Sequence, residues 1–156
     1  MITYKEYRNF LKVANKLSFN EYEHLMDKWV DSLRESCSDD NKWEQVLTWM
    51  REFQTRYMKS VIADYKKKIK TKVQEIAYDF IEGILSADEG CLKAYTINKG
   101  LAEQAKEEIY DNFGDFLLEG IELYEEDNEW VLDGIAGGKY CPCWNGWWDE
   151  MTWGEC

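Results

Sequence analysis

The sequence predicts a mainly α-helical protein, a bundle of long amphipathic helices that ends in a short, irregular segment rich in Trp and Cys. Apolar residues recur at spacings of three and four along most of the chain, which is the period of a helix with one buried face. Pro142 is the single proline, so the first 141 residues lack the strongest helix breaker. The 156 residues are 45% apolar and 15% aromatic, a composition that supports one folded core. We therefore expect one helical domain over 1–156, divided into a near-neutral to basic helical part (1–97), an acidic helix or hairpin (98–133) and a Trp/Cys-rich tail (134–156).

Two helices are predicted near the start of the chain. Residues 3–16 fit one amphipathic helix. Ser18 and Glu21 then form the pattern of a capping box, in which each side chain hydrogen-bonds the other residue's backbone at a helix start. This pattern predicts a helix from about 19 to 36. Its expected buried face consists of Tyr22, Leu25, Met26, Trp29, Val30 and Leu33.

A long apolar stripe follows, from Trp43 to Ile84, with no Gly or Pro before Gly83. A single helix over 42–85 would be about 65 Å long at ~1.5 Å per residue. That length is unusual in a chain of this size, so a break near Ser60 to Asp64 is the alternative. The segment from Ser86 to Gly100 is predicted to be a connection with at most one short helical turn.

A further helix is predicted from Asn98, a plausible N-cap. Its apolar stripe consists of Leu101, Ala105, Ile109, Phe113, Phe116 and Leu117. Helix is favoured here despite Gly114 and Gly120. Beyond Leu123 the chain could continue as helix or form a hairpin that turns at Asp127 and Asn128, and the hairpin is slightly preferred.

Charge is distributed unevenly along the chain. The formal net charge is −12, but residues 1–75 carry 15 Lys and Arg against 12 Asp and Glu, whereas residues 76–156 carry 4 against 19. The acid run, from Glu103 to Asp133, holds twelve acids and one base, Lys106. Because the second half repels nucleic acid and anionic membranes, the partner that suits it is cationic.

Within the acid run, Glu103, Glu107, Asp111 and Asp115 step by four, which places them opposite the apolar stripe if the segment is helical. If the whole run were helical, it would carry about one acid per 4 Å, close to the ~3.4 Å phosphate rise along one DNA strand. In composition the run resembles the short acidic phage-encoded inhibitors of bacterial defence, the anti-restriction and anti-CRISPR proteins that act as DNA mimics. The likeness covers about a fifth of the chain and involves no family motif. It implies an inhibitor that occupies a basic nucleic-acid-binding surface of a partner protein.

The expected partner-binding residues are Glu103, Glu107, Glu108, Asp111, Asp115, Glu119, Glu122, Trp144, Trp147 and Trp148. Three alternatives stay open. The acids could be a plain solvated surface, or they could pair with the basic segment of this chain, which comprises Arg56, Lys59, Lys66, Lys67, Lys68, Lys70 and Lys72. The protein could instead be a structural or assembly subunit that forms a homo-oligomer through its long helix and aromatic tail.

The tail concentrates large aromatic rings beside Cys141, Cys143 and Cys156. Such rings either seal the helical bundle or form a docking surface. The cysteine spacing does not match a usual zinc pattern, and C-x-C differs from the common C-x-x-C redox spacing, so we expect no metal and no cofactor. The KKKIKTK run from Lys66 to Lys72 is basic, but no nucleic-acid-binding motif surrounds it, so we expect no direct binding of nucleic acid.

The sequence favours a binding protein over an enzyme. His24 is the only histidine, and no serine elbow, phosphate loop, dinucleotide fingerprint, metalloprotease helix or EF-hand is present. The start of the chain has no signal-peptide pattern, and no run of about 18 apolar residues occurs. We expect a cytoplasmic protein that does not span a membrane.

Overall fold

The computed structural model describes residues 1–83, 91–96, 98–117 and 120–135. The protein is mainly helical, with one small antiparallel sheet, which confirms the predicted fold class. The described chain forms two compact units. Unit 1 comprises Met1–Val61, and unit 2 runs from Ile62 through the last described residue, Ile135. The Trp/Cys-rich tail, predicted to be irregular, lies outside the described residues beyond this point.

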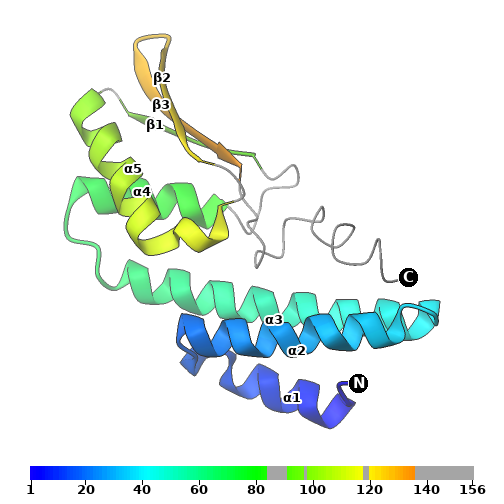
Figure 1. The fold of residues 1–156 in the computed structure, drawn as a ribbon. Coiled ribbons are helices and arrows are strands. Elements are labelled where there is room, and N and C mark those ends of the chain that lie inside the picture. Colours follow the sequence, from blue (N-terminus) through cyan, green and yellow to red (C-terminus); the bar gives the residue numbers. More distant parts are fainter. Residues whose placement is uncertain (84–90, 97, 118–119, 136–156) are drawn as a thin grey trace. The chain divides into compact units, whose positions relative to one another are not determined.

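Unit 1 is built from helices (Figure 1). The predicted helices at 3–16 and 19–36 are confirmed, and each begins with a capping box, Thr3 with Glu6 and Ser18 with Glu21. The elements are α1 (Tyr4–Val13), the 3-10 turn η1 (Ala14–Lys16), α2 (Phe19–Ser36) and the part of α3 (Asp40–Lys66) up to Val61.

Aromatic side chains join these three helices. Trp29 of α2 is fully buried. Its ring lies 6.2 Å from Tyr7 and 5.5 Å from Phe10, both on α1, and 6.2 Å from Phe53 on α3. Buried rings of this size remove large apolar areas from water and favour edge-on contacts. Trp29 therefore joins α2 to both α1 and α3 in the core of unit 1.

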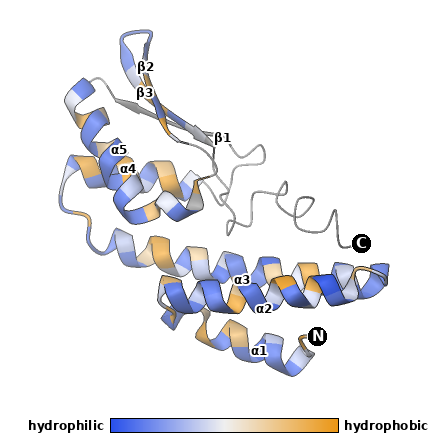
Figure 2. Cartoon of the chain, in the orientation of Figure 1, coloured by the Kyte–Doolittle hydropathy of each residue, from blue (hydrophilic) through white to orange (hydrophobic). Residues whose placement is uncertain are grey.

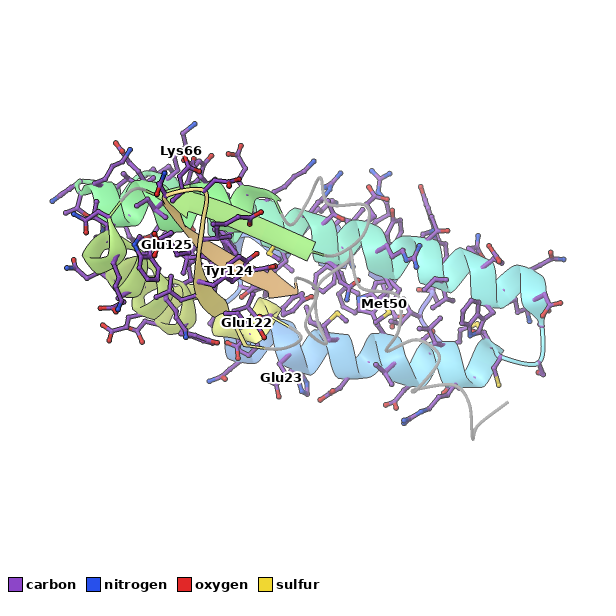
Figure 3. The ribbon with its side chains drawn as sticks, turned by 90° about the horizontal axis from the view of Figure 1, so that it is seen from above. Glu23, Met50, Lys66, Glu122, Tyr124 and Glu125 are labelled. Atoms are coloured by element: carbon purple, nitrogen blue, oxygen red, sulfur yellow. The ribbon has the colours of Figure 1, made fainter. Side chains whose placement is uncertain are left out.

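The predicted buried face of α2 is largely confirmed. Four of its six residues are buried, and the other two, Leu25 and Val30, are half-buried. The buried ones are Tyr22, Met26, Trp29 and Leu33. Figure 3 shows Met50 of α3 between the two helices and Glu23 of α2 pointing away from them.

The prediction of one helix over 42–85 is wrong, and the alternative break at 60–64 lies too early. Helix α3 ends at Lys66, and α4 begins at Lys72 and ends at Glu82. Thr71 accepts a hydrogen bond from the Gln74 backbone while Gln74 reaches back to the Thr71 backbone, so a capping box starts a new helix here. The lysines from 66 to 68 also suit the end of α3, because cations are favoured at the negative end of a helix dipole.

Unit 2 contains the sheet. Its strands are β1 (Cys91–Thr96), β2 (Glu122–Glu126) and β3 (Glu129–Ile135), in the antiparallel order β1-β3-β2. Helices α4 and α5 (Lys99–Phe113) lie on one side of it (Figure 1). The prediction that 86–100 is only a connection is wrong, because this range contains β1. The backbone of β1 pairs with β3, about 40 residues later, and no local pattern encodes such a pairing.

The start of α5 is confirmed, and its end is corrected. The side chain of Asn98 caps α5 by accepting a hydrogen bond from the Leu101 backbone. The helix ends at Phe113 and only the 3-10 turn η3 (Gly114–Phe116) follows, so the predicted helical stripe does not continue to Leu117. Gly114 disfavours a continuation of the helix, because glycine loses more backbone freedom in a helix than any other residue.

The predicted hairpin is confirmed, with its turn at Asp127 and Asn128. These residues have φ angles of 50° and 66°, which match the type I′ turn that joins twisted antiparallel strands. At the other end of β3, a Cβ on Gly134 would lie 3.0 Å from Cζ of Phe80 on α4. Glycine therefore allows the sheet to approach this helix closely.

Across the described ranges, none of the helices combines the length and the apolar character that a membrane span requires.

Tyr7 makes the stability of unit 1 depend on pH in the alkaline range. Burial, and then the hydrogen bond that Tyr7 donates to the carboxylate of Glu52, raise the pKa of Tyr7 from 10.0 to about 12. This contribution to stability is fully present below pH 10 and is lost as pH rises through about 12, where the folded state also releases the proton. We expect the difference in unfolding free energy between the unmodified protein and Tyr7→Phe to shrink over this interval, measured by urea unfolding at a series of pH values. A constant difference would contradict the assignment.

Candidate functional site

The first part of the candidate site is one face of α5. Glu103, Glu107 and Asp111 are exposed and follow one another at about one helical turn, ~6 Å along the axis. The opposite face is buried and consists of Ala102, Ala105, Ile109 and Phe113. Asp115, in η3, is also exposed. We call these four acids, Glu103, Glu107, Asp111 and Asp115, the helix cluster.

Glu108 is placed differently from its neighbours. It is half-buried, and its Oε1 accepts a hydrogen bond of 2.8 Å from the hydroxyl of Tyr65, near the end of α3. The Tyr65 ring also packs edge-on against Phe113 at 4.9 Å. Burial and the bond to Glu108 raise the pKa of Tyr65 well above its usual value. Glu108, predicted as a partner-binding residue, thus joins the end of α3 to α5 within unit 2.

The second part of the candidate site is the β2–β3 hairpin. Residues 120–135 contain six acids and no Lys or Arg. Its tip carries Glu125, Glu126, Asp127 and Glu129, all exposed, and Glu122 lies exposed further along β2. We call these five acids the hairpin cluster. Figure 2 shows the tip as hydrophilic, and Figure 3 shows Glu122 and Glu125 on the hairpin.

The strand register places like charges opposite one another. Glu126 faces Glu129 across the hairpin, and Glu122 faces Asp133. Directly opposed like charges destabilise a strand pair. At the second pair the repulsion is offset, because the hydroxyl of Tyr124 donates a hydrogen bond of 3.0 Å to Oδ2 of Asp133 and the register places Lys93 of β1 opposite Asp133 on the other side of β3. The hairpin therefore forms in spite of its charges.

The part of the basic segment that belongs to unit 2, Lys66 to Lys72, does not neutralise the described acids of either cluster. Lys67, which directly follows α3, lies 3.9 Å from Asp64 of that helix, and Lys72 lies 3.5 Å from Glu75 on α4, so two of its lysines pair with acids three residues away. Between described residues, no lysine from 66 to 72 comes within 4.0 Å of a carboxylate of the acid run. Helix-cluster Glu103 has an ion pair with Lys99 at 3.9 Å, but both side chains are more than half exposed, so water screens it.

The structure changes the predicted site in three ways. The continuous helical column of acids is wrong, because α5 ends at Phe113 and the later acids belong to the hairpin. The acids of the hairpin tip were not among the predicted binding residues, although their Asp-Asn turn marked the hairpin. Glu119 and the predicted binding residues Trp144, Trp147 and Trp148 lie outside the described residues, as do the three tail cysteines.

Among the residues that the structure describes, no group of three or more His, Cys, Asp or Glu is arranged to hold a metal ion. No protein-family model, curated protein or solved structure matches the chain. The likeness to phage-encoded inhibitors therefore depends on the composition of the acid run alone.

Charge repulsion in the hairpin is testable by substitution. We expect Glu126→Lys to raise the free energy of unfolding by about 0.2–1 kcal/mol, since it replaces the repulsion from Glu129 by an attraction. Glu125→Lys is the matched control, because it makes the same charge change on the same strand opposite an uncharged residue, Trp130. Urea unfolding should show the larger gain for Glu126→Lys at low salt and a smaller difference at high salt. Equal gains in unfolding free energy for the two variants at all salt concentrations would show that the pairing of Glu126 with Glu129 does not affect stability.

Proposed function

We propose that this chain is a non-enzymatic binding protein whose acidic clusters occupy a basic nucleic-acid-binding surface of a partner protein and so block it. The proposal is supported by the exposed carboxylates of unit 2, most of which have no counterion among the described lysines and arginines. Such charge is costly to bring together, since like charges one helical turn apart or opposite on strands repel one another. A cationic partner would remove this cost on binding.

The spacing of the carboxylates supports a partner that normally binds phosphates. Successive acids of the helix cluster are separated by ~6 Å along the axis of α5, about twice the ~3.4 Å phosphate rise of one DNA strand. The hairpin cluster adds four acids within five consecutive positions, 125–129. Charge complementarity of this kind accelerates association and selects the partner.

We further infer that Trp144, Trp147 and Trp148 act as aromatic anchors for the partner, since Trp is enriched among the residues that dominate interfaces. We place the encounter in the cytoplasm. Inhibition of the anti-restriction or anti-CRISPR type is the form of this activity that the acid run resembles.

The test uses a charge-neutral variant of the hairpin tip, Glu125→Gln with Glu126→Gln and Glu129→Gln. Proteins captured from the native host by the unmodified chain are identified by mass spectrometry, and the affinity of the chain for each purified basic partner is measured in competition with the nucleic acid that the partner binds. We expect the chain to displace the nucleic acid, with an affinity that falls steeply as salt rises. The tip variant should bind at least about tenfold more weakly, the loss expected when several interfacial charge contacts are removed.

The matched control removes three exposed acids outside both clusters, Asp27→Asn with Glu44→Gln and Glu82→Gln, and should bind like the unmodified chain. A captured partner that binds no nucleic acid, or an affinity that does not change with salt, would contradict the proposal. A salt-stable homo-oligomer that buries both clusters would favour the assembly role instead.

A further inference from the structure

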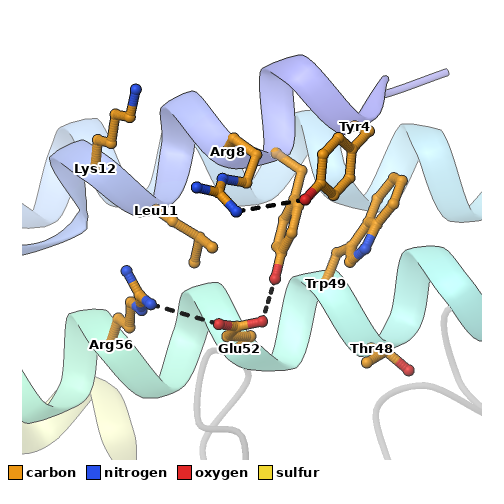
Figure 4. Close-up of a pocket in the computed structure, with 9 residues that line it drawn as sticks. Tyr4, Arg8, Leu11, Lys12, Thr48, Trp49, Glu52 and Arg56 are labelled. Atoms are coloured by element: carbon orange, nitrogen blue, oxygen red, sulfur yellow. Dashed lines mark hydrogen bonds and ion pairs between the residues drawn. The ribbon is translucent and has the colours of Figure 1, made fainter.

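Unit 1 holds a groove that the acidic clusters do not involve. Two adjoining hollows, of about 420 and 410 Å³, lie between α1 and α3 and share the side chains of Leu11, Lys12 and Arg56. Figure 4 shows the first of them. Each volume falls within the range of ligand sites, about 300–1,000 Å³. The first hollow is also lined by Tyr4, Tyr7, Arg8, Thr48, Trp49 and Glu52, and the second by Ala14, Asn15, Lys59 and Ser60.

The first hollow offers aromatic rings to a ligand. Tyr4 is 59% exposed, an unusual state for a large aromatic side chain, and its ring lies 5.9 Å from that of Trp49. Tyr7 stacks on Trp49 at 4.8 Å with an interplanar angle of 13°, which holds the Trp49 ring in place. Arg8 donates a hydrogen bond of 3.3 Å to the Tyr4 hydroxyl. We call this hollow the ring end of the groove.

The second hollow offers cations. Lys12, Arg56 and Lys59 line it and are exposed, and no acid stands among its described lining residues. Glu52 is the one carboxylate that the described part of the chain contributes to the groove, and it belongs to the first hollow, where it accepts the hydrogen bond of Tyr7 and lies 3.6 Å from Arg56. The described lining carries more cations than this one carboxylate, namely Arg8, Lys12, Arg56 and Lys59, so a positive excess remains for a ligand. We call this hollow the phosphate end.

We propose that this groove binds a nucleotide, with the base against Tyr4 and Trp49 and the phosphate among Lys12, Arg56 and Lys59. A nucleotide joins a planar ring to a strong anion, which is the chemistry that the two ends present side by side. Bases stack on aromatic rings, and charge-assisted hydrogen bonds to phosphate are the strong ones. The site is independent of the acidic clusters and of the function proposed for them.

The charge of the whole chain favours a mononucleotide over a nucleic-acid polymer. With a net charge of −12, the chain repels a long polyanion. A short anion responds mainly to the cations of the groove, because charges more than about 8 Å away are screened at physiological ionic strength.

Isothermal titration calorimetry of the full chain tests the proposal with five probes: ATP, AMP, adenosine, inorganic phosphate and a single-stranded oligonucleotide. We expect ATP and AMP to bind more tightly than adenosine and phosphate, since only they occupy both ends. Equal binding of phosphate and AMP would reduce the groove to an unspecific anion site and overturn the proposal. Tighter binding of the oligonucleotide than of ATP, or no binding of either nucleotide, would also overturn it.

Variants of exposed residues assign the two ends. Lys12→Glu with Lys59→Glu should weaken AMP binding at least about tenfold, the effect of losing charge-assisted contacts. Lys5→Glu with Lys28→Glu makes the same charge change at exposed lysines outside the groove and should leave the affinity within about twofold. Tyr4→Ala should weaken AMP binding and leave phosphate binding unchanged. Thermal unfolding verifies that each variant is folded, and equal losses in the groove variant and its control would overturn the assignment.

Discussion

Repulsion between carboxylates is the constraint that organises unit 2. Acids lie one helical turn apart on α5 and face one another across the strands of the β2–β3 hairpin. The lysines of 66–72 pair locally or remain exposed. The apolar side of these elements has to offset that cost. Buried residues of α5 and β3, with the Tyr65–Glu108 hydrogen bond, do so by holding the helix, the sheet and the end of α3 together.

Unit 1 follows a different rule, because its stability comes from rings rather than from balanced charge. The buried Trp29 contacts aromatic residues of both neighbouring helices, and this packing fixes α1 beside α3. The groove between α1 and α3 is a consequence, since the same packing that orders Tyr7 and Trp49 leaves Tyr4 exposed beside a row of cations. One chain thus presents an acidic surface from one unit and a basic groove from the other.

Local signals predicted the elements whose causes are local. The Ser18 capping box placed α2, the Asn98 cap placed the start of α5, and the Asp-Asn pair placed the hairpin turn. Non-local causes were missed, as with β1, which forms only because β3 pairs with it. The break after α3 was mispredicted for another reason: the Thr71–Gln74 capping box was present in the sequence, but the uninterrupted apolar stripe suggested one helix. The acids of the site could be identified from the sequence. The structure was needed to show that they are divided between a helix and a hairpin, and that Glu108 is hydrogen-bonded inside unit 2.

Both acidic clusters function as a binding surface only if their carboxylates are open to solution and to a partner. Carbodiimide-mediated labelling of carboxylates, followed residue by residue with mass spectrometry of the folded protein, measures this directly. We expect fast labelling of Glu107, Asp111 and the acids of the hairpin tip, and slow labelling of Glu108, whose Oε1 accepts the hydrogen bond of Tyr65. Slow labelling throughout both clusters that becomes fast only on unfolding would mean that the chain already covers its own acids, and the clusters could then not serve as a binding surface.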